Sequence, residues 1–270
     1  MRVYANSFNI FVHFQTKHSL RYFLKLAYCG SAYHGWQTQP GVATVQETIE
    51  KALSLILGTK TAVTGAGRTD TGVHAREYYL HFNTNQAPED NLVFRLNSLL
   101  PKDIAVYECM PVRLDAHARY DAVKRTYTYT ITTQKNPFLT DAAFYLQTPL
   151  HLEAMQEAAD ILKQYENFKC FTKSNTDVNH YLCRIDEVNW RVDGALLVFQ
   201  ITANRFLRNM VRAIVGTLLD IGSGKKTVAN MHQIILNQNR SEAGFSVPAH
   251  GLSLVSICYP SDIFLDQTHA

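Results

Sequence analysis

Apolar and polar positions alternate in several short segments of the first hundred residues, the pattern of strands with one buried face. Between them, Val45, Ile49 and Leu53 recur at the spacing of a helix that buries one side. Thr44 and Glu47 form a capping-box pattern before that helix, so we expect their side chains to cap its first turn. The predicted elements are strand 22–28, helix 45–56, strand 60–64, strand 76–82, helix 91–100 and strand 104–110.

The second part of the chain repeats this order of periodicities. Asp193-Gly194 separates two alternating segments, which is a strong signal for a β-hairpin. One helix is added before the final strand. The predicted elements are strand 125–133, helix 151–164, strands 181–192 and 195–203, helices 207–221 and 227–237, and strand 252–259.

Each half therefore has the order β-α-β-β-α-β, which is that of the ferredoxin-like split βαβ motif. We predict an α+β protein in which two such halves form an extended, mainly antiparallel sheet. The helices pack on one side of it, and the active-site cleft lies between the halves. The predicted division is an N-terminal extension 1–19, a first half 20–115 and a second half 116–270.

Composition excludes several classes of protein. The chain has 270 residues, 46% hydrophobic and 18% charged, which is ordinary for a globular protein and not for a disordered one. No apolar run approaches the roughly 18 residues of a membrane helix, and residues 8–14 lack the flanks of a signal peptide. We expect no membrane association. The net charge of only +3 requires any basic surface to be local.

The cysteines indicate a reducing compartment. There are five, scattered and never in a CxxC pair, which argues against both a disulfide framework and a zinc site. No close pair of histidines has ligand spacing either. We therefore predict a cytoplasmic protein without a metal.

The densest chemical signal is residues 65–75, with the sequence GAGRTDTGVHA. Its glycines permit tight turning, but it lacks the Gly-Lys-Ser/Thr of a phosphate-binding loop. Asp70 stands between Arg68 and His74, and a carboxylate kept ionised by nearby cations can act as a nucleophile or a base. The alternative is an ordinary turn, for which the same residue types are typical.

Two further patterns can serve a nucleic-acid substrate. Arg205, Arg208 and Arg212 have spacings of three and four, so we expect them on one side of the predicted helix 207–221, gripping phosphates or, for Arg212, pairing with a carboxylate. Tyr127 lies on a predicted strand and offers a flat ring on which a base can stack. The alternatives are a solvated helix face and ordinary core packing.

Taken together, these motifs resemble the TruA-type tRNA pseudouridine synthases. The resemblance begins at residue 21 and covers almost all of the remaining chain. The segments that carry it are YCG at 28–30, GWQ at 35–37, TVQE at 44–47, GRTDTGVHA at 67–75, HAR at 117–119, RTYTY at 125–129, NMVR at 209–212, IVG at 214–216 and PAHGL at 248–252.

The resemblance implies an isomerase that converts uridine to pseudouridine at positions 38, 39 and 40 in the anticodon stem-loop of tRNA, without cofactor or metal. Asp70 would be the catalytic aspartate and Tyr127 the tyrosine that contacts the target base. Arg212 would pair with Asp70, and Arg68 would displace the target nucleotide. Arg205 and Arg208 are assigned to the tRNA backbone, and a homodimer would cradle one tRNA.

Alternatives stay open at this level. Asp70 can attack ribose C1′, assist elimination to a glycal-like intermediate, or add to uracil C6. Tyr127, Asp70 or water can remove the proton from C5. A ferredoxin-like RNA-binding module without catalysis would need aromatic RNP motifs, which the sequence lacks. A nucleoside hydrolase that uses Asp70 would act on free nucleosides and release uracil.

Overall fold

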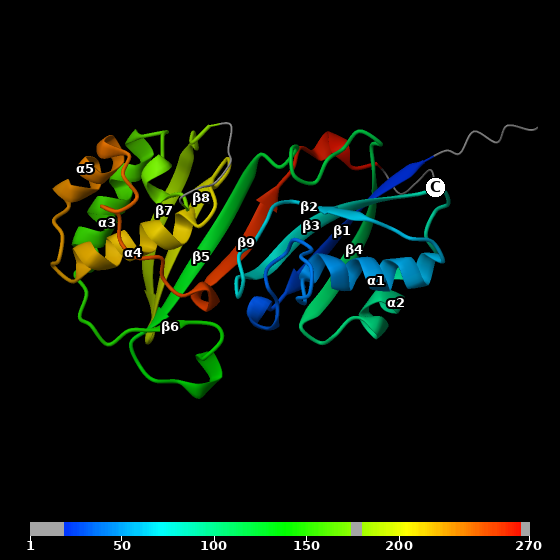
Figure 1. Ribbon diagram of the computed structural model, residues 1–270, viewed down its shortest axis with the longest axis horizontal. Helices are drawn as coiled ribbons and strands as arrows, with labels where there is room; N and C mark the ends of the chain where they lie inside the picture. Colours follow the sequence, from blue (N-terminus) through cyan, green and yellow to red (C-terminus); the bar gives the residue numbers. More distant parts are fainter. Residues whose placement is uncertain (1–18, 174–179, 266–270) are drawn as a thin grey trace, which may run out of the picture.

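The computed structural model of the protein describes residues 19–173 and 180–265 (Figure 1). Apart from residue 19, the predicted N-terminal extension lies outside the described residues. All predicted helices and strands are present, with ends displaced by at most four residues. The first half contains β1 (Leu20–Tyr28), α1 (Val45–Leu57), β2 (Val63–Gly65), β3 (His74–Thr84), α2 (Leu92–Leu99) and β4 (Ile104–Val112).

The second half has the same order with two additions. One is the expected extra helix, and the other is the two-residue strand β6, which no pattern in the sequence predicts. Its elements are β5 (Lys124–Thr132), β6 (Phe144–Tyr145), α3 (Leu152–Ile161), β7 (Ile185–Asp193), β8 (Leu196–Ala203), α4 (Met210–Gly222), α5 (Ala229–Asn237) and β9 (Leu252–Cys258). The predicted hairpin turns at Gly194, which has a positive φ of 58°.

The sheet joins the two halves side by side. Its strand order is β4-β1-β3-β9-β5-β8-β7, with β2 beside β3. The four main strands of each half are antiparallel and have the same internal order, the short β6 pairs with β5 in parallel, and the halves meet where β3 pairs with β9 in parallel. This junction is short, with His74 opposite Ser253 and Ala75 opposite Leu254. The predicted fold class, two ferredoxin-like halves in one mainly antiparallel sheet, is confirmed.

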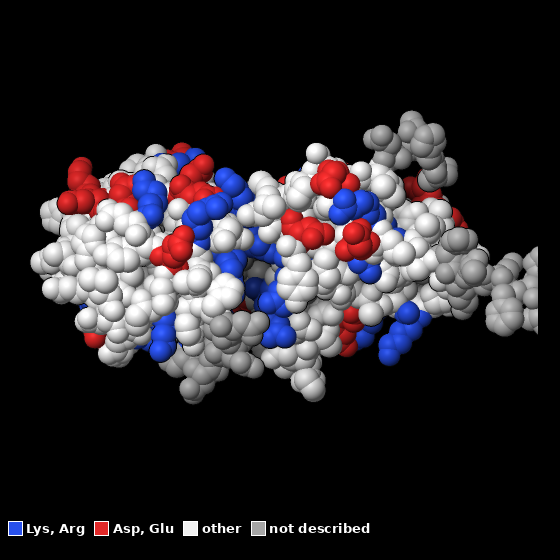
Figure 2. All heavy atoms as spheres, turned by 90° about the horizontal axis from the view of Figure 1, so that it is seen from above, with Lys and Arg blue, Asp and Glu red and all other residues white. Residues whose placement is uncertain are grey.

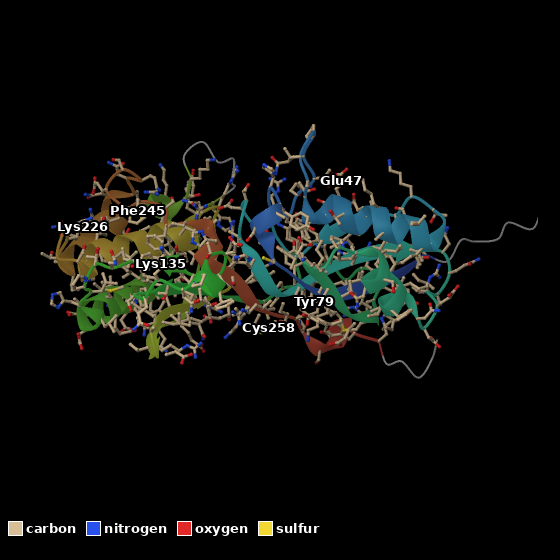
Figure 3. The ribbon with its side chains drawn as sticks, turned by 90° about the horizontal axis from the view of Figure 1, so that it is seen from below. Glu47, Tyr79, Lys135, Lys226, Phe245 and Cys258 are labelled. Atoms are coloured by element: carbon tan, nitrogen blue, oxygen red, sulfur yellow. The ribbon has the colours of Figure 1, made fainter. Side chains whose placement is uncertain are left out.

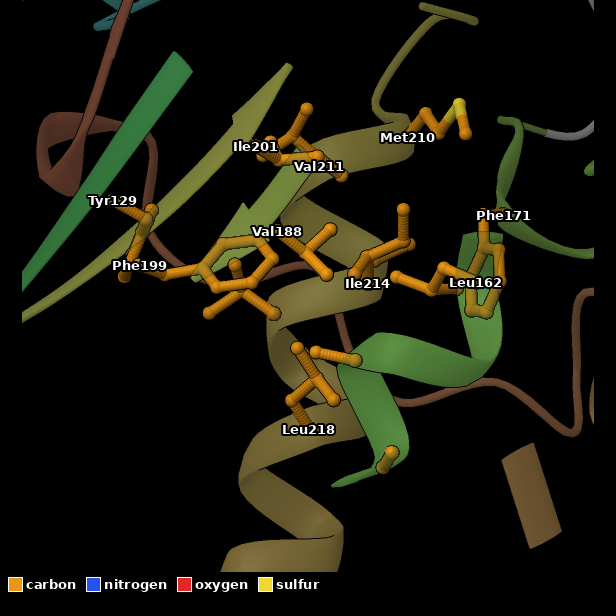
Figure 4. Close-up of a cluster of buried hydrophobic side chains, with 14 of the residues drawn as sticks. Tyr129, Leu162, Phe171, Val188, Phe199, Ile201, Met210, Val211, Ile214 and Leu218 are labelled. Carbon is orange, nitrogen blue, oxygen red and sulfur yellow. The ribbon is translucent and has the colours of Figure 1, made fainter. Parts of the chain in front are cut away.

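The helices of both halves lie on the same side of the sheet. In Figure 3, α1, which carries Glu47, and α4 both lie on that side. Each half has its own core, built around Phe23, Leu53 and Leu80 in the first half. In the second, α4 inserts Ile214 and Leu218 against the sheet (Figure 4). Burying one such side chain stabilises the fold by roughly 1.5–3 kcal/mol.

Both cores include residues that the sequence assigns to the other half. Val73 packs in the second core, and Ala116 and Ala118 pack in the first. Strand β9 contributes Leu252 to the second core and Leu254 to the first. The two halves are thus interlocked across β3 and β9, and the exact domain boundary stays a prediction.

The predicted capping box at the start of α1 is wrong. Thr44 occupies the N-cap position, but its side chain makes no capping hydrogen bond. Its buried hydroxyl finds no partner among the described residues. Glu47 pairs with Lys51 one turn later, at 2.6 Å, instead of reaching back. The favourable i,i+4 ion pair therefore replaces the reciprocal cap.

Two further findings concern membrane-spanning helices and cysteines. In residues 19–173 and 180–265, no helix is both long and apolar enough to cross a membrane. All five cysteines lie in the described part of the chain, and each is a free thiol.

Candidate active site

Asp70 lies on the turn between β2 and β3, residues 66–73, which we call the Asp70 corner. The end of β1 and the segment that follows it hold this corner in place. The Tyr28 hydroxyl is 2.9 Å from the Thr69 hydroxyl, and the backbone N–H of Trp36 donates to the Thr69 carbonyl at 3.2 Å. The residue before Asp70 is therefore fixed through both its side chain and its backbone.

Gly35 is required for this close approach. It has a φ of 87°, and a Cβ at this position would lie 2.4 Å from the Thr69 carbonyl oxygen. A side chain here would meet both backbone strain and a collision with the corner. The sequence motif GWQ at 35–37 thus serves the site by allowing the segment after β1 to touch the residue next to Asp70.

His74 anchors the other end of the corner. Its Nδ1 accepts a hydrogen bond from the Gly30 N–H at 3.0 Å, so Nε2 carries the proton and donates to the His250 carbonyl at 3.0 Å. Burial lowers the pKa of His74, which favours this neutral form. The ring joins the segment after β1, the corner and the C-terminal half.

Two guanidinium groups face the Asp70 carboxylate. Arg212 Nη1 lies 3.6 Å from Asp70 Oδ2, and Arg208 Nε lies 3.8 Å from Oδ1. The Arg212 side chain is 20% exposed and is fixed by a 2.7 Å hydrogen bond from Nε to the Val247 carbonyl, whereas Arg208 is 56% exposed. Arg212 is therefore the better ordered partner of a carboxylate that is itself 26% exposed.

The predicted arginine stripe on one helix is wrong. The helix α4 begins only at Met210, because Asn209 has a positive φ of 67° that interrupts the helical path. Arg205 and Arg208 lie in the segment 204–209 before it, which we call the α4 approach. Arg208 nevertheless reaches Asp70. Arg205 Nη1 turns to the His180 ring, 2.9 Å from its Nε2.

Tyr127 lies on β5, between β8 and β9, and its ring packs edge to face against Phe206 at a centroid distance of 5.2 Å. Burial raises the pKa of Tyr127 to about 12. The negative charge of Asp70 adds to this shift, and the positive charge of Arg125 opposes it. The phenol is therefore neutral near pH 7. The ring can stack on a base and the hydroxyl can donate a hydrogen bond, but the neutral phenol is a poor base while its pKa stays raised.

Arg68 occupies the outer side of the corner. It is exposed, and its Nε donates to the Gln37 side chain at 3.3 Å. It lines a small pocket together with Arg119, Trp36 and Gln46. The pocket puts two guanidinium groups next to the backbone of Gly67, three residues before Asp70.

The distribution of charge explains how a chain of net charge +3 can still bind a polyanion. Figure 2 shows Lys and Arg side chains gathered around a hollow between the two halves. Arg208 and Arg212 of the second half face Asp70, and a concave basic surface attracts phosphate groups.

Several contributors were not identified as such from the sequence. Phe206 carries no motif of its own, although an aromatic residue between two arginines is a weak signal for a stacking surface, and Gln37 lies in the GWQ motif without a role assigned to its side chain. In the described ranges, no three His, Cys, Asp or Glu side chains are grouped so that they could hold a metal ion.

The chain is similar to known tRNA-modifying enzymes. The family described as tRNA pseudouridine synthase matches residues 26–121 and 163–260. The tRNA pseudouridine synthase A of Porphyromonas gingivalis is 49% identical over 91% of this chain and 99% of its own. That of Syntrophomonas wolfei is 41% identical over 88% and 97%.

Solved structures give only a weak likeness. A chain in a crystal structure of a Cbf5-Nop10-Gar1 complex is 9% identical, with a TM-score of 0.31, and the match covers 86% of this chain and 57% of that one. At that score the likeness bears neither on fold nor on function. The sequence relatives are 41% and 49% identical and are matched over 97% and 99% of their own length, and the family model matches most of the chain: the chain belongs to the tRNA pseudouridine synthase family.

Proposed function

We propose that this enzyme converts uridine to pseudouridine at positions 38, 39 and 40 in the anticodon stem-loop of tRNA, with Asp70 as its catalytic carboxylate. The observation that carries the proposal is the placement of Asp70. It lies on a rigid corner, facing Arg212 and Arg208. Lys and Arg side chains also surround a hollow between the two halves, and a concave basic surface of this kind attracts the phosphates of RNA (Figure 2).

The target uridine must leave its stack to reach Asp70, at a cost of a few kcal/mol. Stacking on the Tyr127 ring offsets part of this cost, since base–aromatic stacking contributes roughly 1–3 kcal/mol. The edge-to-face contact with Phe206 holds that ring in place. Arg68 is assigned to displace the target nucleotide, and its exposed guanidinium, bonded to the Gln37 side chain, supports this role.

The isomerisation breaks the bond between ribose C1′ and uracil N1 and forms a bond between C1′ and C5. N1 gains a proton and C5 loses one, so no oxidant, reductant or cofactor takes part. Asp70 acts at C1′, by attack or by assisted elimination, or at uracil C6. Arg212 lies 3.6 Å from the carboxylate and, as its charged partner, holds it in position for the reaction.

The high pKa of Tyr127 bears on the last step. A neutral phenol is not a base for the C5 proton near pH 7, so Asp70 or a water molecule is the better candidate in the free enzyme.

Arg205 and Arg208 are proposed to contact the tRNA backbone. Arg208 is the more exposed partner of Asp70 and can turn toward a phosphate without leaving the corner unpaired, since Arg212 stays in place. A homodimer around one tRNA and a cytoplasmic location complete the proposal.

The experiment that tests the proposal is mapping of pseudouridine in tRNA incubated with the purified enzyme. Unmodified transcripts that carry uridine at 38, 39 or 40 are treated, and each is compared with a transcript that has cytidine at that position. Pseudouridine at those positions alone is expected. Modification only elsewhere in the tRNA, or release of free uracil, would contradict the proposal.

A further inference from the structure

Arg125 makes the most extensive set of side-chain contacts near the site, and the mechanism above does not use it. It lies at the start of β5, two residues before Tyr127. Its guanidinium donates to four backbone carbonyls: Nη1 to Asn204 at 3.1 Å and to Ala122 at 3.3 Å, and Nη2 to Arg119 at 2.8 Å and to Ala66 at 3.0 Å. Most of its hydrogen-bonding capacity is therefore directed into the protein.

The four carbonyls belong to three segments that meet at the site. Ala66 begins the Asp70 corner. Arg119 and Ala122 lie on the connecting segment 113–123 between β4 and β5, which also contributes the Arg119 side chain to the pocket beside Arg68. Asn204 begins the α4 approach, which carries Phe206 and Arg208.

Pairing of the strands does not by itself fix these segments. The halves meet through only two residue pairs of β3 and β9, and the corner, the connecting segment and the α4 approach all lie outside the strands. A single planar group that bonds to all three provides a link that the sheet lacks.

The charge of Arg125 is also unusual in its surroundings. In the part of the chain that the structure describes, its guanidinium has carbonyl partners and no carboxylate partner. Burial lowers the pKa of Arg125, while the neighbouring Tyr127 and Tyr259 oppose this shift, and the guanidinium stays protonated. Removing a cation from water costs free energy unless it is well bonded. The hydrogen bonds to four carbonyls offset this cost, and they fix the relative positions of the segments around the site.

We propose that Arg125 is a positioning residue, whose guanidinium holds the Asp70 corner, the connecting segment and the α4 approach at the spacing that admits one uridine between Asp70 and Tyr127. This inference rests on the proposed roles of those two residues. It assigns Arg125 no contact with the RNA, because its donors are already engaged by the protein.

Lysine cannot replace this link. Its ammonium is a point charge with three donors on a flexible stem, and it lacks the planar fork that reaches carbonyls on three segments at once. We therefore expect the Arg125→Lys variant to fold but to hold the corner loosely. A displacement of about 1 Å at a catalytic group can lower a rate about a hundredfold.

The test compares Arg125→Lys and Arg125→Gln with the matched control Thr126→Val. Thr126 is the next residue on β5, and its hydroxyl bonds to that of Thr202 across the sheet, at 2.9 Å. For each variant, kcat, tRNA dissociation constant and Tm are measured. Activity is followed as tritium release from tRNA labelled at C5 of all uridines, so the result does not depend on which position is modified.

We expect Arg125→Lys to lower kcat about 30- to 100-fold, with the dissociation constant unchanged within about threefold and Tm lowered by only a few degrees. Thr126→Val should retain wild-type kcat. A weakened tRNA affinity with kcat intact would assign Arg125 to RNA binding and overturn the proposal. So would wild-type kcat in both Arg125 variants, or failure of both to fold, which would make Arg125 a support of the whole fold.

Failure of the proposed function has a different signature. If Asp70 or Tyr127 had no part in the reaction, variants of these two residues would retain activity, whatever the activity of Arg125→Lys. If positions 38–40 were not the target, the wild type would still release tritium from other uridines, and the comparison among the Arg125 variants would remain valid.

Discussion

Replacing Arg212 by glutamine removes the better ordered of the two cations that face Asp70. The guanidinium nitrogen that is lost lies 3.6 Å from the carboxylate, and Nε of the same side chain is bonded to Val247. Glutamine keeps a polar side chain on α4 but no charge. The expected consequence is a slower chemical step, because Asp70 loses the charged partner that aims its carboxylate.

The magnitude follows from Coulomb's law. Two unit charges 3.6 Å apart interact by about 1 kcal/mol in water and about 5 kcal/mol at an effective dielectric constant of 20. Asp70 and Arg212 are 26% and 20% exposed, so solvent screens part of the larger value, and we take about 1.5–3 kcal/mol. We equate this energy with the energy that holds the carboxylate in its reacting position, so its loss corresponds to a decrease of about 10- to 150-fold in kcat.

Arg208 provides the matched comparison. Its Nε is 3.8 Å from the same carboxylate, but 56% of its side chain is exposed. Exposed ion pairs contribute about 0–1 kcal/mol, so Arg208→Gln should lower kcat by no more than about fivefold. The assay is tritium release at saturating tRNA, with binding measured separately. Equal losses of kcat in the two variants, or a wild-type kcat in Arg212→Gln, would refute this reasoning.

Three further predictions concern binding, pH and backbone geometry. Arg208→Glu should weaken tRNA binding and reduce the slope of log affinity against log salt by about one, because fewer counterions are released. His81 is buried and its pKa is lowered to about 4. Stability should therefore fall as the pH drops from about 6.5 to about 4, because over this range the unfolded chain binds a proton that the folded protein does not. The His81→Asn variant keeps an acceptor for the Ala118 N–H and should remove about 3 kcal/mol of this pH dependence. Gly35→Ala should lower kcat as well as stability, since its Cβ would collide with the Thr69 carbonyl.

Each of the three has a control on the same chain. Lys226→Glu, at the far end of the second half (Figure 3), should leave the salt slope unchanged, and the account fails if Arg208→Glu behaves the same way. Urea unfolding between pH 4 and 7 tests His81, and identical pH profiles for variant and wild type would exclude it. Gly41 has a φ of 76°, but a Cβ added there would meet no atom of the described residues within 4 Å, so Gly41→Ala should cost stability alone. Equal kcat in the two glycine variants would contradict the role of Gly35.

The periodicity of the chain predicts the fold well, because strand alternation and helical spacing are local patterns. It fails where a competing side-chain contact or the backbone conformation of one residue decides the outcome. The capping box at Thr44 is replaced by an ion pair between Glu47 and Lys51, a competition that the motif cannot show. The arginine stripe fails because Asn209 adopts a positive φ, so the helix begins after Arg205 and Arg208.

Some residues of the candidate site can be predicted from the sequence and others cannot. Asp70, Tyr127 and Arg212 are marked by motifs, and the structure brings Arg212 to Asp70 without any spacing in the sequence that would reveal it. Phe206 and Arg125 act through contacts with residues far along the chain. The partners of Arg125 are main-chain carbonyls, which every residue possesses, so no pattern of side chains can predict them.

The most direct test of the central claim is tritium release by the Asp70→Asn variant. Forming the C1′–C5 bond expels the C5 hydrogen of uridine, so tRNA labelled there releases tritium in step with pseudouridine. The wild type should release tritium, and Asp70→Asn should release none. The variant should still bind tRNA at least as tightly as the wild type, because Arg208 and Arg212 no longer face a carboxylate. Tritium release by Asp70→Asn at a rate close to that of the wild type would contradict the account.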